Sequence, residues 1–109
     1  TTRRRLEQRG FQVKEAGDGM AALGCLKSEK YDLVVTDIDM PRMDGIELVT
    51  EMIRANLSGI EIIVSSARDE LEVMDRLDSQ RVAGFLQKPV RPEAFDEILR
   101  TLDCTSATV

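Results

Sequence analysis

Three polar side chains with complementary chemistry stand at the ends of three separate apolar runs. They are Asp37, Ser66 and Lys88. A carboxylate can accept a phosphoryl group, a hydroxyl can hydrogen-bond its oxygens, and an ammonium can neutralise their charge. Each residue also has an ordinary alternative role, as a helix cap, a turn residue or a solvated charge. Together they predict a site for phosphoryl chemistry, provided that the fold brings the three runs side by side.

The apolar residues alternate between strand-like and helix-like spacing. Strands are predicted at 11–15, 33–35, 60–64 and 84–87, and helices around 20–26, 46–53, 71–77 and 95–102, with 1–10 as the remnant of an earlier helix. This alternation predicts an α/β fold, a doubly wound parallel sheet with right-handed crossovers and helices on both faces. Functional groups of such sheets gather at the carboxyl ends of the strands, where Asp37, Ser65, Ser66 and Lys88 stand.

Composition excludes several other functions. The 109 residues are enough for one domain, and a formal net charge of −5 argues against direct nucleic-acid binding by this domain. The absence of histidine excludes a Ser/His/Asp triad and a histidine-ligated zinc. The two cysteines, Cys25 and Cys104, are too few for a disulfide framework and favour a reducing, cytoplasmic setting. No apolar run approaches the roughly 20 residues that a membrane span needs.

Short segments of the sequence also match, in part, three motifs of other functions. Residues 17–22 (GDGMAA) match the dinucleotide pattern G-x-G-x-x-A, but the preceding strand is polar enough for a sheet edge and the chain is too short for two nucleotide-binding halves. A calcium loop starting at Asp37 would need glycine in place of Arg42 and glutamate in place of Leu48. A small aspartyl-phosphate hydrolase, with Asp37 as nucleophile and Asp39 as the neighbouring acid, stays open as an alternative.

The candidate site residues lie within three longer segments whose order and spacing are informative. The segments are 31–45 (YDLVVTDIDMPRMDG), 62–67 (IIVSSA) and 84–89 (GFLQKP). With them the chain resembles, over essentially its whole length, the receiver domain of two-component response regulators. The first segment is highly specific for this family. The resemblance implies the flavodoxin-like receiver fold, with strand order 2-1-3-4-5.

The resemblance also implies a role for each candidate residue. Asp37 matches the aspartate that takes a phosphoryl group from a histidine kinase, with Mg²⁺ bridging carboxylates and phosphoryl oxygens. Asp37 and the backbone carbonyl of Asp39 match metal ligands, so the side chain of Asp39 is not implied to be one. Ser66 matches the hydroxyl that turns toward the phosphoryl group, and Lys88 matches the cation that pairs with it. Phe85 matches the switch aromatic.

The implied function is a signalling switch and not a turnover enzyme. Phosphorylation would draw in Ser66 and Lys88, let Phe85 rotate inward, and shift the population toward a second packing. The family's fourth helix, fifth strand and fifth helix form the face that presents this change. The implied partners are a sensor histidine kinase or phosphotransfer protein and a downstream effector or output domain, with no membrane and with a homodimer as an option. The Lys88-Pro89 bond matches one that is usually cis. A phosphate-independent, receiver-like interaction module is the other alternative.

The chain departs from the family at its beginning. A receiver normally starts with a strand ending in two acidic residues that help to hold Mg²⁺, whereas residues 1–10 match the helix after that strand. Without the strand, 11–15 lacks a partner and 33–35 has one bare edge, which is costly. Three explanations are open: truncation of a longer protein, which is favoured, pairing between two chains, or another segment filling the gap. Weak Mg²⁺ binding is expected, because Asp37 is the only matched metal carboxylate.

The expected organisation is a receiver domain over residues 1–103, incomplete at its N-terminus, followed by a tail. The tail, residues 104–109, has no apolar periodicity, so it is expected to be frayed.

Overall fold

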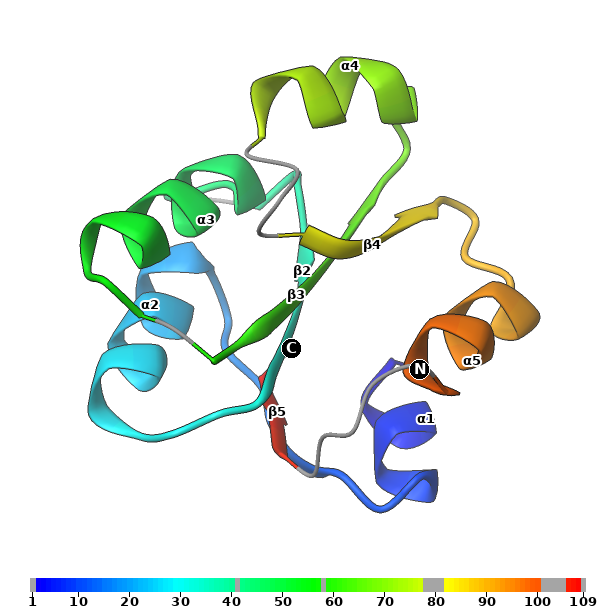
Figure 1. Ribbon diagram of the computed structural model, residues 1–109, viewed down its shortest axis with the longest axis horizontal. Helices are drawn as coiled ribbons and strands as arrows, with labels where there is room; N and C mark the ends of the chain where they lie inside the picture. Colours follow the sequence, from blue (N-terminus) through cyan, green and yellow to red (C-terminus); the bar gives the residue numbers. More distant parts are fainter. Residues whose placement is uncertain (1, 41, 58, 78–81, 101–105, 109) are drawn as a thin grey trace.

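The structure is a computed structural model that describes residues 2–40, 42–57, 59–77, 82–100 and 106–108. Its helices are α1 (Thr2–Gln8), α2 (Gly19–Ser28), α3 (Gly45–Arg54), α4 (Glu70–Arg76) and α5 (Pro92–Arg100). Its strands are β1 (Gln12–Lys14), β2 (Leu33–Asp37), β3 (Glu61–Ser66), β4 (Val82–Gln87) and β5 (Ser106–Thr108). The predicted alternation of helices and strands is therefore confirmed (Figure 1). Leu102, the end of the last predicted helix, lies outside the described residues, as do Pro41 and Cys104.

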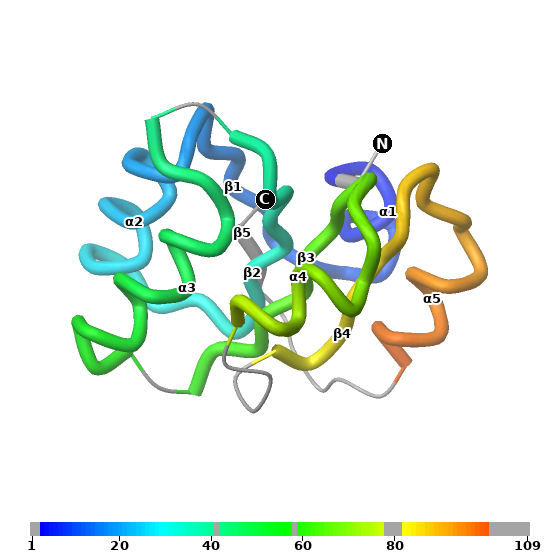
Figure 2. Tube along the Cα trace, turned by 90° about the horizontal axis from the view of Figure 1, so that it is seen from above, coloured from blue at the N-terminus to red at the C-terminus, as the bar shows by residue number. Residues whose placement is uncertain are grey.

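The strands form one five-stranded sheet in the order β1-β5-β2-β3-β4, and all its pairs are parallel. The helices cover both faces, with α2 and α3 on one side and α1 and α5 on the other (Figure 2). The predicted parallel α/β sheet is confirmed, and β1 lies at the sheet edge, as its polar residues indicate. No helix among the described residues combines the length and apolar character that a membrane crossing requires.

Residues 106–108 correct the expectation of a frayed tail. They form β5, which lies between β1 and β2. The register pairs Val13 with Ala107 on one side and Leu33 with Ala107 on the other. Backbone groups at two facing bare edges need partners, and a third parallel strand provides them. Of the three explanations for the gap, the structure shows another segment filling it. The proposed domain division at residues 103 and 104 stays a prediction.

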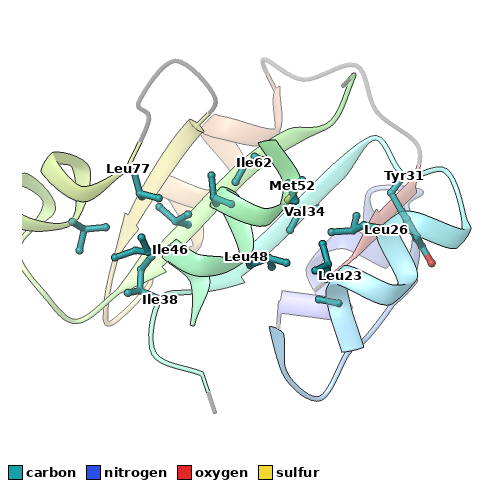
Figure 3. Close-up of a cluster of buried hydrophobic side chains, with 14 residues drawn as sticks. Leu23, Leu26, Tyr31, Val34, Ile38, Ile46, Leu48, Met52, Ile62 and Leu77 are labelled. Atoms are coloured by element: carbon teal, nitrogen blue, oxygen red, sulfur yellow. The ribbon is translucent and has the colours of Figure 1, made fainter. Parts of the chain in front are cut away.

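Strand β2 supplies side chains to two cores, one on each face of the sheet. Val34 packs with α2 and α3 in the larger cluster, around Leu48 and Met52 (Figure 3). Leu33 and Val35 point to the other face, into a smaller cluster formed with α1 and α5. The alternation follows from the two-residue period of a strand, and burial on both faces explains why β2 reads as a continuous apolar run. The strand that ends in Asp37 is therefore rigidly held.

Candidate functional site

The carboxyl ends of β2, β3 and β4 bring the three predicted polar residues to one edge of the sheet. Asp37 pairs in register with Ser65, and Ser66 pairs with Gln87, the residue before Lys88. Backbone hydrogen bonds continue past the strand ends, because Ile38 N donates to Ser65 O at 2.9 Å and Lys88 N donates to Ser66 O at 2.8 Å. Asp37, Ser66 and Lys88 thus come from three adjacent strands at one end of the sheet, as predicted.

Asp37 and Lys88 are in direct contact. Lys88 Nζ forms an ion pair with Asp37 Oδ2, and Asp37 Oδ1 accepts a hydrogen bond from Asp39 N at 3.0 Å. The side chain of Asp37 is 32% exposed and that of Lys88 is 40% exposed. The carboxylate is therefore oriented by two donors and still accessible from solvent, as a nucleophile must be to attack the phosphorus of an incoming donor.

A cavity of about 280 Å³ opens beside this ion pair. Its lining combines the polar ends of the strands with apolar side chains: Val35, Thr36, Asp37, Met40, Ser65, Lys88 and Val90. The cavity is small for an organic ligand, since such pockets span about 300–1,000 Å³. Its single carboxylate-ammonium pair lies where a phosphoryl group could be bound.

Ser66 lies close to this edge, but its hydroxyl is engaged elsewhere. The residue is fully buried, and Ser66 Oγ accepts a hydrogen bond from Arg68 N at 2.9 Å. Ser65, the preceding residue, is the serine that lines the cavity. A hydroxyl can rotate between partners at low cost. The predicted turn of Ser66 toward a phosphoryl group would exchange its partner on the loop for one in the site.

Arg68 is a site neighbour that the sequence analysis did not single out. Its guanidinium Nη2 donates to Asp39 Oδ1 at 2.9 Å, which links the loop after β3 to the loop after β2. The signal was available, because Arg68 follows Ser66 by two residues and the carboxyl ends of adjacent strands meet. Asp39, the neighbouring acid of the hydrolase alternative, thus has an exposed ion-pair partner in Arg68.

The loop that connects β2 to α3, residues 38–44, closes tightly over the end of β2. Gly45 N donates to Ile38 O at 2.9 Å, and Asp44 caps α3 by accepting from Glu47 N at 2.8 Å. A Cβ atom on Gly45 would lie 2.6 Å from the carbonyl oxygen of Asp37, closer than side chains come to backbone. Glycine at position 45 therefore permits the close approach that fixes Asp37 at the mouth of the cavity.

A second contact ties this loop to α2, and the sequence analysis missed it. Asp18 caps α2 by accepting from Ala21 N at 2.8 Å, and its other oxygen accepts from Arg42 Nε at 2.7 Å. These two donors hold the pKa of Asp18 below its usual value, the backbone N–H having the larger effect. A Cβ on Gly19 would overlap the backbone of Met43. Gly19, the second glycine of 17–22, thus allows helix-loop packing, which disfavours the dinucleotide interpretation.

Phe85 lies on β4, away from Asp37. It is half-buried and packs against the larger core cluster. A second cavity of about 280 Å³ lies beside it, lined by residues of β4, α5 and the start of α4: Glu70, Phe85, Leu86, Gln87, Arg91 and Ala94. The first residue after Glu70, Leu71, is 79% exposed. An aromatic ring that is half-buried beside free volume has room for a second rotamer, so the predicted switch role is sterically feasible.

The residues present fit a minimal Mg²⁺ site. Among the described residues there is no group of three or more Cys, Asp or Glu side chains that could hold a metal. Mg²⁺ nevertheless takes one or two carboxylates and completes its shell with phosphate oxygens and water. Asp37 offers one accessible carboxylate, and the loop after it carries the Asp39 carbonyl.

The Lys88-Pro89 bond is cis, as predicted from the resemblance.

Comparison with known proteins identifies relatives along nearly the whole chain. The family described as response regulator receiver domain matches residues 1–100. The transcriptional regulatory protein TctD of Salmonella typhimurium is 39% identical over 99 residues, which cover 89% of this chain and 43% of that protein. The response regulator MprA of Mycolicibacterium vanbaalenii is 38% identical over 104 residues, covering 89% and 40%. The chain therefore spans less than half the length of these curated relatives.

Solved structures agree with the sequence relatives. The receiver domain of Francisella response regulator 1452 has a TM-score of 0.76 at 28% identity, covering 90% of this chain and 78% of that one. A CheY-like receiver domain protein from Methanospirillum hungatei JF-1 has a TM-score of 0.81 at 25% identity, covering 92% and 79%. The predicted flavodoxin-like fold is therefore confirmed, with β5 at the position of the expected first strand.

Proposed function

Because the chain belongs to the response regulator receiver domain family, we propose that Asp37 accepts a phosphoryl group from a histidine kinase or phosphotransfer protein and that the domain then switches conformation. The observation that supports this most is the Asp37-Lys88 ion pair beside a small cavity at the carboxyl edge of the sheet. A nucleophilic carboxylate, an adjacent cation and a cavity with room for a phosphoryl group are the parts that the transfer needs.

The transfer itself is an attack of a carboxylate oxygen of Asp37 on phosphorus. The new O–P bond forms as the P–N bond of the donor breaks, and the donor imidazole leaves as the neutral ring after taking up a proton. Asp37 and the Asp39 carbonyl would hold Mg²⁺, which supplies positive charge against the phosphoryl oxygens when bound. Lys88 is already in contact with Asp37 and stays within reach of the new oxygens.

The switch follows from the charge that phosphorylation adds. Phosphorylation gives Asp37 three further acceptor oxygens and a charge of about −2 in place of the −1 of the carboxylate. The Ser66 hydroxyl, whose oxygen accepts from Arg68 N, can then turn and donate its own proton to a charged phosphoryl oxygen. The volume that it vacates and the cavity beside Phe85 allow the ring to move inward. The surface made by α4, β4 and α5 would present the change to an output domain.

The remaining assignments extend this proposal. The chain belongs to the receiver domain family, whose members are signalling modules. We propose that this domain also acts as a signalling module and does not turn over a substrate. The relative TctD is a transcriptional regulatory protein. Because this chain has a formal net charge of −5, we propose that any DNA binding belongs to an effector or output domain and not to this domain. The proposed setting is the cytoplasm, and a homodimer is the proposed assembly to examine.

One alternative keeps a specific observation in its favour. A phosphate-independent interaction module would have the receiver fold without a working acceptor site, and among the described residues Asp37 is the only carboxylate that lines the cavity. The third candidate, the hydrolase, would be identified by repeated turnover of a phosphate ester. The measurement below separates the first two.

The proposal is tested by intact mass after incubation with Mg²⁺ and a small phosphoryl donor. We expect a gain of one phosphoryl group in the parent and none in Asp37→Asn. Asp44→Asn is the matched control, because asparagine keeps the helix cap while removing a nearby carboxylate. A control variant that behaves like the parent supports Asp37 as the acceptor. No gain in the parent would favour the phosphate-independent module, and an equal gain in Asp37→Asn would place the phosphoryl group elsewhere.

A further inference from the structure

Arg42 adopts a backbone conformation that its residue type disfavours. Its φ is 65°, in the left-handed region where glycine is the usual residue. A non-glycine residue there costs of the order of 1 kcal/mol or more and persists where the surroundings compensate. The visible compensation is the side chain, because Arg42 Nε donates to Asp18 Oδ2 at 2.7 Å. The contact therefore coincides with local strain in the loop that follows Asp37.

Asp18 is a rigid anchor for that contact. Its side chain is 9% exposed, whereas that of Arg42 is 72% exposed. One carboxylate oxygen is fixed by Ala21 N, the cap of α2, so the other oxygen points to Arg42. Because the Arg42 guanidinium stays largely solvated, its ion pair with the buried Asp18 carboxylate adds little to the stability of the fold. Its main effect is to fix the position of the loop that carries Arg42.

The next residues on each side also touch. Gly19 approaches Met43 so closely that a Cβ would overlap the Met43 carbonyl. Asp18, the N-cap of α2, and Gly19, its first residue, therefore meet two successive residues of the β2–α3 loop. The other end of the loop is closed by Gly45 N on Ile38 O. The loop is held at both ends, and Asp39 lies between the two attachments.

Resting on the proposed function, we propose that Asp18 and Arg42 are a positioning pair that fixes the β2–α3 loop for phosphoryl transfer. Arg42 lies three residues after Asp39, whose N–H orients Asp37 and whose carbonyl would hold the metal. Releasing Arg42 frees the loop to shift, and displacements of about 1 Å are enough to slow a transfer reaction strongly. Neither residue touches the reacting atoms, so neither is a catalytic residue.

Two single variants separate positioning from folding. Asp18→Asn keeps an N-cap side chain for α2 and removes the charge that Arg42 binds. Arg42→Gly removes the guanidinium and relieves the left-handed strain. Both proteins are expected to remain folded, with the Ala21 amide still protected in Asp18→Asn. Glu51→Gln is the matched control, because it breaks an exposed ion pair with Arg54 on α3, outside the loop.

The test is amide hydrogen exchange of the full chain without metal, followed by initial phosphorylation rates with a small phosphoryl donor at several Mg²⁺ concentrations. We expect Asp39 N–H to exchange about threefold faster or more in Asp18→Asn and Arg42→Gly, with phosphorylation slowed by about tenfold. The double variant should resemble either single variant, because both remove one interaction. Glu51→Gln should match the parent in both measurements.

Each failure has a separate signature. If exchange at Asp39 and the phosphorylation rates are unchanged in both variants, the positioning role is wrong and the acceptor role of Asp37 stands. If the two single effects add fully in the double variant, the residues act independently and the pair is also wrong. If exchange rises but the parent itself is never phosphorylated, the proposed function fails, and the claim of positioning for transfer fails with it.

Discussion

Asp37 has two fixed contacts, Lys88 on one oxygen and Asp39 N on the other. The sequence could predict the first, because strand ends of a parallel sheet converge and the residue types are complementary. It could not predict that the Ser66 hydroxyl faces Arg68 N, since a side-chain rotamer depends on the local loop. Nor could it predict the Asp18-Arg42 contact, which joins residues 24 positions apart through two loops.

Lys88→Gln tests the cation of the site. The variant keeps a polar side chain but loses the charge that would neutralise the phosphoryl oxygens, and charge-assisted bonds contribute about 1.5–3 kcal/mol. We therefore expect the initial phosphorylation rate, followed by intact mass, to fall by about ten- to a hundredfold. Lys27→Gln, in the last turn of α2, is the control and should leave the rate unchanged. An equal loss in both variants would attribute the effect to overall charge.

Asp18 predicts a pH dependence of stability. Its pKa in the folded protein lies below the ordinary value of 3.8, because of the Ala21 N–H and then Arg42. A lowered pKa stabilises the fold above the unfolded-state pKa, and this contribution is lost as pH falls through the folded-state pKa. In urea unfolding, the stability difference between the parent and Asp18→Asn should shrink as pH falls below about 4. A difference that stays constant from pH 7 to the acid limit would contradict this.

At the scale of elements, the buried strands β2 and β3 were predictable from the sequence, whereas strand β5 was not. Continuous apolar runs identify β2 and β3 because both faces of a parallel sheet are buried. Strand β5 escaped prediction because three residues cannot show a period, and its formation depends on two facing edges far away in the sequence. Helix α5 starts at Pro92, earlier than its apolar face indicates, because proline suits the first turn of a helix.

Gly45→Ala tests how the β2–α3 loop is attached to β2. The added Cβ would meet the Asp37 carbonyl oxygen at 2.6 Å and Ile38 Cα at 3.0 Å, both backbone atoms that cannot yield easily. We expect a loss of stability of about 1–3 kcal/mol in urea unfolding. Gly24→Ala is the matched control, because nothing lies within 4 Å of its Cβ position in the interior of α2. It should gain about 0.5–1 kcal/mol from helix propensity. Equal effects of both changes would contradict the close approach.

At the scale of the whole molecule, the sheet separates two cores and leaves its carboxyl edge for the site. The α2–α3 side holds the loop after Asp37, and the α4–β4–α5 surface lies beside Phe85, so one charged group at Asp37 can influence both. Family membership explains why these parts occur together. The sequence predicted this layout because the order of elements limits how a parallel sheet can be wound.

The central claim is that Asp37 is the residue that carries the phosphoryl group. The most direct measurement is peptide mapping by mass spectrometry after phosphorylation with Mg²⁺ and a small donor, with hydroxylamine added to trap an acyl phosphate as a stable hydroxamate. We expect one hydroxamate, located at Asp37. A hydroxamate at Asp39 or Asp44 instead, or phosphorylation of a hydroxyl side chain with Asp37 unmodified, would contradict it.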